Sequence, residues 1–156
     1  MTKSILTRRD IEKLSHHKQV LLACFCAEQV IHLIKEEYRT ECVKAVQTAY
    51  LFLEGKATQE ECYAASNVAA DVAAAAYTAA TTVHAADAIA ADAAAAAAYT
   101  VSDVGDATIS AVNAATNAVD AVDAESRSST IEAQWNFYDQ LLNTDKYFEE
   151  IVLGWK

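Results

Sequence analysis

Apolar residues recur every three or four positions along most of this chain, which is the spacing of an α-helix. No segment alternates apolar and polar residues for long enough to predict a strand. Three four-residue segments resemble capping boxes that start helices: Thr7–Asp10, Thr58–Glu61 and Ser129–Glu132. Gly55 stands where a helix would end. The pattern therefore predicts an all-α fold, a single-domain helical bundle.

Alanine dominates the middle of the chain, where no glycine or proline stands between Gln59 and Val101. Alanine is the best helix former, so we expect one long, bent central helix here, about 64 Å in length at 1.5 Å per residue. If this helix breaks, Thr81-Thr82 is the favoured place, because hydroxyl residues can cap a new helix. The expected buried stripe is narrow and consists of Val72, Ala76, Ala79, Val83, Ala86, Ala90, Ala94, Ala97 and Val101.

Composition divides the single domain of 156 residues into three parts. Residues 1–56 form helices of mixed charge, residues 57–126 form alanine-rich acidic helices, and residues 127–156 form helices rich in aromatic side chains. Three glycines and no proline in the whole chain argue against a turn-rich β architecture. The aromatic residues near the C-terminus are large enough to close one end of a bundle that is otherwise packed with alanine.

The charge of the chain is concentrated in its middle part. Residues 57–126 carry ten carboxylates and no lysine or arginine, and the net charge of the whole chain is −10. A few carboxylates on one helix surface can steer association with a basic protein. A merely solvated acidic surface explains the same carboxylates and stays open as an alternative. We expect a protein partner, and the candidate partner-binding residues are Asp71, Tyr77, His84, Asp87, Asp92, Tyr99, Asp103 and Asp106, with the two tyrosines as aromatic anchors.

The same acidic middle part could imitate a nucleic acid. Duplex DNA carries one charge per ~1.7 Å of its axis, whereas the acidic residues here give roughly one per 10 Å of helix. They also do not share one helix face. An acidic mimic of nucleic acid stays open as an alternative, and direct binding of nucleic acid is not expected.

Candidate catalytic chemistry is confined to one pair. His84 and Asp87 are three residues apart and could act as a general acid–base pair, but no nucleophile lies near them in the sequence. We favour a structural hydrogen bond or a place on a partner surface as the explanation of this pair. The chain has no glycine-rich phosphate loop and no His-x-x-x-His motif. We expect no enzyme activity and no cofactor.

The cysteines do not form a metal-binding pattern. Cys24 and Cys26 would point about 200° apart on a helix, so they cannot share one ion. Cys42 and Cys62 also fall within helical patterns, and we expect four free thiols and no metal. The N-terminal residues lack the apolar core of a signal peptide, and aspartates interrupt the alanine tract too often for a membrane span. We expect a cytoplasmic protein that does not enter the membrane.

The segment from Glu41 to Glu61 contains a helix that ends in Glu-Gly-Lys-Ala-Thr and leads into an alanine-dominated helix. Together with the tract His84-Ala-Ala-Asp87, this layout resembles the alanine-rich immunity-protein families of bacteria and their phages over about residues 41–125. The resemblance implies a short cytoplasmic helical protein that neutralises a toxin or a foreign factor by binding it. Members of these families often place arginine within the alanine-rich helix, and this chain does not.

We therefore predict a small non-enzymatic protein that binds and neutralises a protein partner, as an immunity-type or phage counter-defence inhibitor in a bacterial or phage-infected cell. A self-associating scaffold stays open as the alternative, because a stripe of alanine also suits a close seam between copies of the chain. In that case the protein would be a homo-oligomer.

Overall fold

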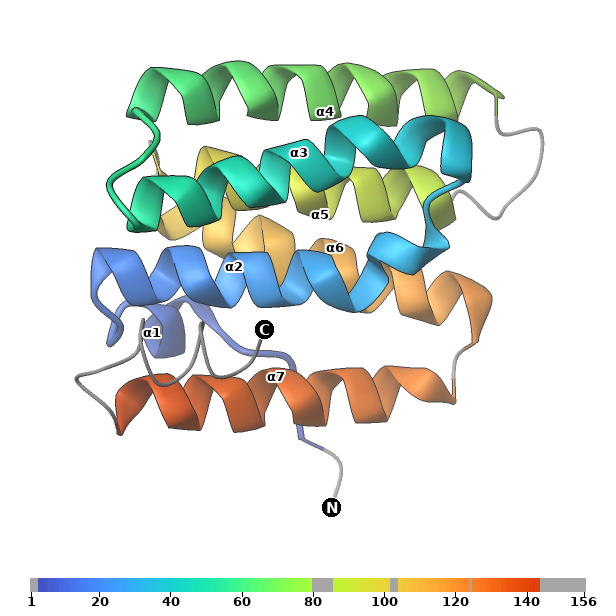
Figure 1. Ribbon diagram of the computed structural model, residues 1–156. Helices are drawn as coiled ribbons and strands as arrows, with labels where there is room; N and C mark the ends of the chain where they lie inside the picture. The colour runs from blue at the N-terminus through green and yellow to red at the C-terminus, as the bar shows by residue number, and fades with distance from the viewer. Residues whose placement is uncertain (1–2, 80–85, 102–103, 124, 144–156) are drawn as a thin grey trace.

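The protein is a bundle of helices (Figure 1), as the spacing of apolar residues predicted. This computed structural model describes residues 3–79, 86–101, 104–123 and 125–143, and omits the side chains of residues 77–79, 87, 104 and 105. All regular structure within these ranges is helical. The elements are α1 (Arg8–Ile11), α2 (His16–Val30), the 3-10 helix η1 (Ile31–Leu33), α3 (Glu36–Leu53), α4 (Gln59–Ala79), α5 (Ala86–Tyr99), α6 (Val104–Val122) and α7 (Ser126–Leu142).

Two of the three expected capping boxes start helices. The backbone N–H of Thr7 donates to Asp10 Oδ2 at 2.9 Å, and the Asp10 N–H donates back to Thr7 Oγ1 at 3.4 Å, which opens α1. These hydrogen bonds from Thr7 hold the pKa of the Asp10 carboxyl below its usual value. The Thr58–Glu61 box opens α4 in the same way, with reciprocal distances of 2.7 and 3.1 Å. Gly55 follows α3 with a φ of +74°, a left-handed conformation that favours glycine.

The predicted capping box at Ser129–Glu132 was wrong. Helix α7 begins at Ser126, so Ser129 lies inside its first turn and donates to the Ser126 carbonyl instead. The turn before the helix is made by Asp123, whose carboxylate accepts hydrogen bonds from the Ser126 hydroxyl and the Glu125 N–H. The Ser126 hydroxyl, followed by the Glu125 N–H, holds the pKa of Asp123 below its usual value. The hydrogen bonds that the Asp123 carboxylate accepts therefore fix the start of α7 at Ser126.

The prediction of one long, bent central helix was also wrong. Helix α4 ends at Ala79, α5 begins at Ala86, and the two run antiparallel and pack against each other (Figure 1). The expected break at Thr81-Thr82 falls in residues 80–85, outside the described residues. The physical reason for the reversal is the composition of α5, which corresponds to the second half of the predicted long helix. A helix that is apolar all round must be covered on every side, and a helix that continued past the domain would leave that surface in water.

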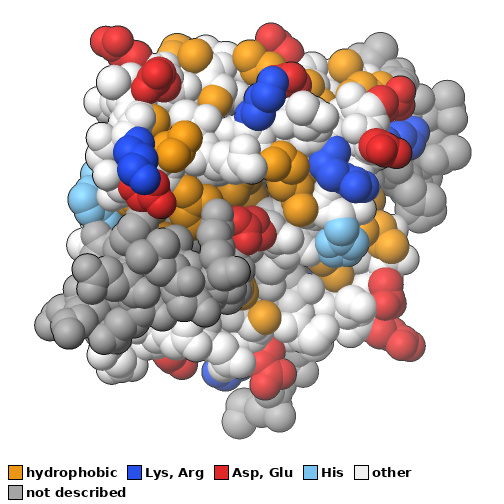
Figure 2. Space-filling view, in the orientation of Figure 1, with side chains coloured by type: hydrophobic (Ala, Val, Ile, Leu, Met, Phe, Trp, Pro, Cys, Tyr) orange, Lys and Arg blue, Asp and Glu red, His pale blue; other side chains and the backbone are white. Residues whose placement is uncertain are grey.

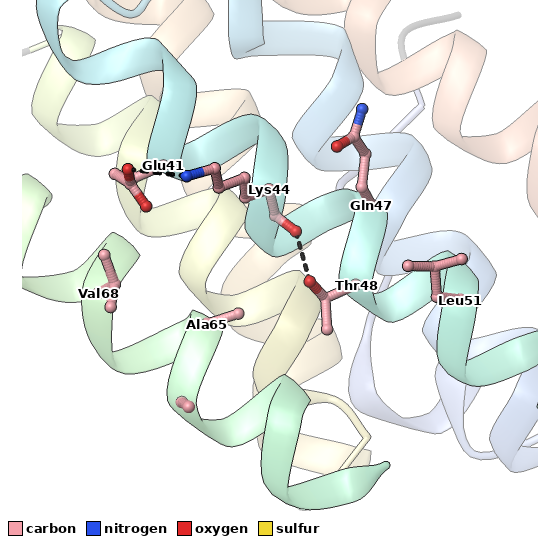
Figure 3. A pocket seen from close by; sticks show the side chains of 8 residues that line it. Glu41, Lys44, Gln47, Thr48, Leu51, Ala65 and Val68 are labelled. Atoms are coloured by element: carbon pink, nitrogen blue, oxygen red, sulfur yellow. Dashed lines mark hydrogen bonds and ion pairs between the residues drawn. The ribbon is translucent and has the colours of Figure 1, made fainter. Parts of the chain in front are cut away.

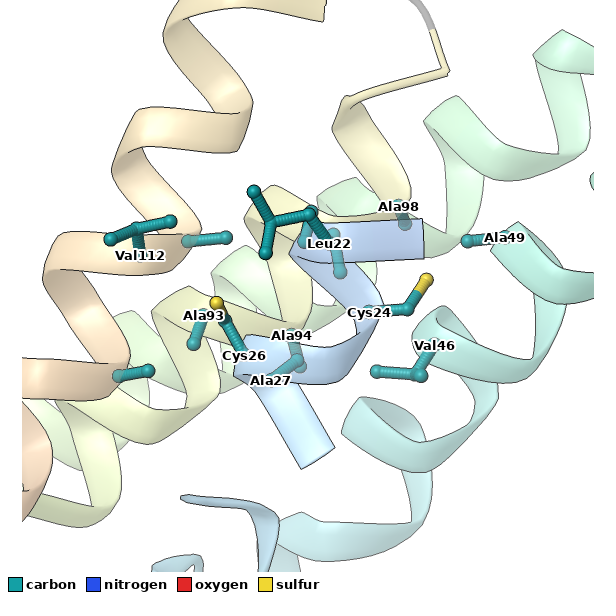
Figure 4. Close-up of a cluster of buried hydrophobic side chains, with 14 of the residues drawn as sticks. Leu22, Cys24, Cys26, Ala27, Val46, Ala49, Ala93, Ala94, Ala98 and Val112 are labelled. Carbon is teal, nitrogen blue, oxygen red and sulfur yellow. The ribbon is translucent and has the colours of Figure 1, made fainter. Parts of the chain in front are cut away.

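Helix α5 is the centre of the bundle. It packs against α2, α3, α4 and α6, and Figure 4 shows Ala93, Ala94 and Ala98 among side chains of α2, α3 and α6. The alanines of α5 that have no exposed surface are Ala88, Ala90, Ala91, Ala93, Ala94, Ala97 and Ala98. Six of the residues expected in the narrow stripe are buried, namely Ala76, Ala86, Ala90, Ala94, Ala97 and Val101. Burial nevertheless extends well beyond one stripe, because small side chains let neighbouring helices approach α5 closely from several directions.

Buried hydroxyl groups in and around α5 are satisfied by backbone carbonyls. Ser66 of α4 donates to the Ala95 carbonyl at 2.8 Å, and Thr100 donates to the Ala97 carbonyl at 2.6 Å. On α6, Thr116 donates to the Val112 carbonyl at 3.0 Å. These side chains therefore lie in the core without the cost of an unpaired polar group.

Aromatic side chains attach α7 to the N-terminal part of the chain. The rings of Phe25 and Phe137 stack with their centroids 4.4 Å apart. Trp135 Nε1 donates to the Ser4 carbonyl, and the Tyr138 hydroxyl donates to the Asp10 carbonyl, both at 2.7 Å. The expected last short helix falls within residues 144–156, outside the described residues.

The packing of α5 makes a prediction about side-chain volume. Ala94→Leu should lower the free energy of unfolding by about 1–3 kcal/mol or more, because there is no space for three further carbon atoms between closely packed helices. The matched control is Ala70→Leu on α4. Because Ala70 is exposed, this substitution should change the free energy of unfolding by less than about 0.5 kcal/mol. Urea unfolding followed by circular dichroism measures both, and equal stability of the two variants would contradict the packing described here.

Candidate functional site

The structure does not bring the predicted partner-binding residues onto one surface. Asp71 is exposed on α4, whereas Asp106 lies at the start of α6 and pairs with Arg8 of α1 at 2.9 Å. Helix α4 runs along the top of the bundle in Figure 1, whereas α1 lies in its lower half, near α2 and α7. Asp92 is half-buried on α5, and Tyr99 is exposed at the end of that helix. The described acidic residues are therefore distributed over the bundle.

The remaining predicted residues have no described side chain. His84 and Asp103 fall outside the described residues, and of Tyr77 and Asp87 only the helical backbone is described. The acid–base pairing of His84 with Asp87 thus stays a prediction. Tyr99 does have an aromatic neighbour that the sequence analysis missed, since its ring lies 6.0 Å from that of Tyr63, which is also exposed.

The cysteines are free and fully buried. Burial, with smaller contributions from the carboxylates of Glu41 and Asp92, raises the pKa of Cys42 to about 11. Burial, followed by the carboxylate of Glu61, raises the pKa of Cys62 to about 11, and burial alone raises the pKa of Cys26 well above its usual range. Thiols in such surroundings behave as small apolar core residues and are poor nucleophiles.

The two adjacent histidines at the start of α2 have a structural contact. His16 Nε2 lies 3.2 Å from the Thr100 carbonyl, just past the end of α5. Gln59 Nε2 donates to the next carbonyl, that of Val101, at 3.3 Å. Side chains from α2 and α4 thus satisfy carbonyl groups at the C-terminal end of α5. Among the described side chains, no group of three or more histidine, cysteine or acidic residues is placed to hold a metal ion.

A groove of about 410 Å³ lies between α3 and α4 (Figure 3). Val68 and Ala65 project from α4 towards α3, and Thr48 projects from α3 towards α4. Leu51 and Val68 are large apolar side chains, and they are 41% and 43% exposed. The residues that line the groove are Glu41, Lys44, Gln47, Thr48 and Leu51 from α3, and Ala64, Ala65 and Val68 from α4. Its lining is therefore apolar along α4 and mixed along α3.

Local contacts fix the two sides of the groove. The Cys62 thiol of α4 lies 3.5 Å from the Thr48 carbonyl of α3 and donates to it. The Thr48 hydroxyl donates to the Lys44 carbonyl at 2.7 Å, and Lys44 Nζ pairs with Glu41 Oε1 at 3.3 Å. Both helices are continuous past the groove, so its shape is set by regular secondary structure. A site built on helices in this way is already formed before anything binds.

Charges are distributed unequally on the two sides of the groove. Helix α4 carries Glu60, Glu61 and Asp71 and no lysine or arginine. Helix α3 and its flanking residues, 35–56, carry four basic and four acidic side chains. On the face shown in Figure 2, charged side chains of both signs lie next to one another, with hydrophobic side chains exposed among them. The groove therefore has an acidic margin on the α4 side.

The sequence contained only part of the signal for this groove. Ala64, Val68, Asp71 and Ala75 follow the helical spacing i, i+4, i+7, i+11, and all four are exposed. Alanine also occupies the opposite, buried side of α4, so the pattern alone could not show which side faces solvent. Leu51 is the clearer signal of an exposed apolar position, because it lies outside the buried residues of α3, which are Cys42, Ala45, Val46, Ala49 and Tyr50.

Comparison with family models, curated proteins and solved structures finds no match to this chain. The resemblance of residues 41–125 to alanine-rich immunity proteins therefore stays a prediction. In the part of the chain that the structure describes, none of the helices combines the length and hydropathy needed to span a bilayer.

The buried thiols make a prediction about reactivity. At pH 8, a thiol with a pKa of about 11 is ionised in roughly one molecule in a thousand, so a thiol reagent should modify none of the four cysteines of the folded protein quickly. In denaturant all four should react within the mixing time. Mass spectrometry counts the modified thiols, and rapid labelling of any one cysteine in the folded protein would contradict its burial.

Proposed function

We propose that the protein is a stoichiometric binding protein of the immunity or counter-defence type, which works in the cytoplasm by covering a functional surface of a protein partner. The observation that carries the proposal is the groove between α3 and α4, with Leu51 and Val68 on its two sides. Exposed apolar side chains are common on proteins, but grouped ones that line a concave surface between polar neighbours are typical of interaction sites.

The arrangement of the groove favours a protein that binds a partner over a self-associating scaffold. Its sides are regular helices fixed by α5 beneath them, so little ordering would be required on association. The exposed alanines allow a partner to come close to the α4 backbone, and Leu51 and Val68 supply apolar area to be buried. The carboxylates of α4 would steer a basic partner to this side of the molecule.

The resemblance of residues 41–125 to immunity proteins supports the same proposal, since that segment contains both walls of the groove. In such a mechanism the inhibitor needs no chemistry of its own. It prevents the partner from acting by occupying the surface that the partner uses, and it does so in a one-to-one ratio. The affinity depends on a few well-buried contacts rather than on the whole area.

Site-specific crosslinking in the native cell tests the proposal. A photo-reactive amino acid in place of Val68 should capture one predominant protein, because this side chain lies in the proposed interface. The control carries the same amino acid in place of Val122, which is 60% exposed and far from α4, at the end of α6. The purified partner should then lose its activity when it is mixed with an equimolar amount of the chain.

Three results would contradict the proposal. Identical crosslinked proteins from both positions would show that position 68 has no special partner. Full activity of the captured partner in the complex would exclude an inhibitor. Crosslinking of position 68 to a second copy of the chain alone would favour the self-associating scaffold instead.

A further inference from the structure

Building on the proposed function, we infer that the groove between α3 and α4 receives a single amphipathic helix of the partner, with small or medium apolar residues along its centre and lysine or arginine near both ends, about three turns apart. The inference concerns the chemistry of the partner surface. It follows from the order of exposed residues on α4, from the shape of the groove and from the charge of this face.

On the exposed side of α4, two carboxylates flank an apolar stretch. Glu60, Ala64, Val68, Asp71 and Ala75 recur at helical spacing and are all exposed. Eleven residues separate Glu60 from Asp71, which corresponds to about 16 Å along the helix. Ala64 and Val68 lie between these two carboxylates and also line the groove. A ligand that fits this order has cationic groups about 16 Å apart with apolar side chains between them.

The shape of the groove fits a helix. On α3 its lining residues run from Glu41 to Leu51, ten residues or about 15 Å of helix, and α4 forms the other wall. Two helices side by side leave a channel into which the side chains of a third helix can pack. Ala64 and Ala65 leave room for those side chains, whereas Leu51 and Val68 stand at its margins as contacts for them (Figure 3).

The charge of this face distinguishes a cationic helix from a second copy of the chain. Residues 35–56 carry four basic and four acidic side chains, and residues 57–79 add three acidic side chains and no basic one. Lys44 and Lys56 are already paired, with Glu41 at 3.3 Å and with Glu54 at 3.0 Å. Two copies would thus bring together two faces of net negative charge, on molecules of net charge −10 each. A cationic helix meets the opposite sign.

The test uses two synthetic peptides with a fluorescent label. Both are helix-forming, about 18 residues long, with alanine and leucine along one face, and they differ only in carrying either lysine or glutamate at two positions eleven residues apart. Fluorescence anisotropy measures their binding to the full chain. The lysine peptide should bind with one-to-one saturation and at least about tenfold more tightly than the glutamate peptide, and added salt should reduce this difference.

Variants of the chain locate the site. Val68→Asp should weaken binding of the lysine peptide at least about tenfold, and Leu51→Asp should have a similar effect from the other wall. The combined change Glu60→Gln, Glu61→Gln and Asp71→Asn should weaken it by about tenfold and flatten its salt dependence. All of these side chains are exposed, and glutamine at position 61 can still complete the capping box.

A matched control separates local charge from net charge. Asp120→Asn, Glu132→Gln and Asp139→Asn together remove the same number of exposed carboxylates from α6 and α7. This variant should bind the lysine peptide within about twofold of the unchanged chain. Circular dichroism of every variant should match that of the unchanged chain.

Equal binding of the two peptides, or an equal loss in the two carboxylate variants, would overturn the inference. So would a dimer that Val68→Asp dissociates while neither peptide binds, because the occupant would then be a second copy. Other results would distinguish a failure of the proposed function from a failure of this inference. If a natural partner is crosslinked to position 68 through a strand or an acidic segment, the proposed function stands and the inferred cationic helix is excluded. If the lysine peptide binds but no natural partner is inhibited, the inferred chemistry of the groove stands and the proposed inhibitory function is excluded.

Discussion

The close burial of α5 is the constraint on which the rest of this structure depends. The helix Ala86–Tyr99 presents mostly methyl groups and has no single apolar side, so it is stable only where neighbours cover most of its circumference. Four helices do so here, and alanine permits each of them to approach closely. The reversal of the chain between α4 and α5, the position of α2 and α6, and the burial of the cysteines all follow from this need for cover.

The same constraint explains why a groove is left at the surface. Helix α4 covers one side of α5 and packs otherwise mainly on α3, so its outer side, including Val68 and Asp71, remains exposed. Because that side is also made of small residues and carboxylates, it presents an apolar channel with an acidic margin. The proposed binding function therefore resides in a helix at the edge of the bundle (Figure 1), on walls that the core holds in place.

The sequence was sufficient for the fold class and for several helix ends. Thr7 and Thr58 cap helices because their hydroxyl and partner carboxylate act within one turn, and Gly55 ends one for an equally local reason. One continuous helix was favoured over the reversal after Ala79, since alanine favours helix equally on both sides and no glycine or proline marks the reversal. Thr81-Thr82 was the sequence signal for a break. Asp71 and Tyr99 are exposed as expected, but Asp92 is half-buried, because periodicity in a helix of alanine does not identify its exposed side. Leu51 was overlooked although it lies off the buried stripe of α3, because single apolar residues off a stripe are common and only tertiary packing shows that this one lines a groove.

Native-state hydrogen exchange tests the central role of α5 most directly. If this helix is the core that its neighbours cover, its backbone amides should exchange only when the whole protein unfolds, with a free energy of opening equal to the global free energy of unfolding. The amides of α4 should open at lower free energy, because this helix lies at the edge of the bundle. Exchange of the α5 amides at lower free energy than those of α2 and α3 would contradict the account.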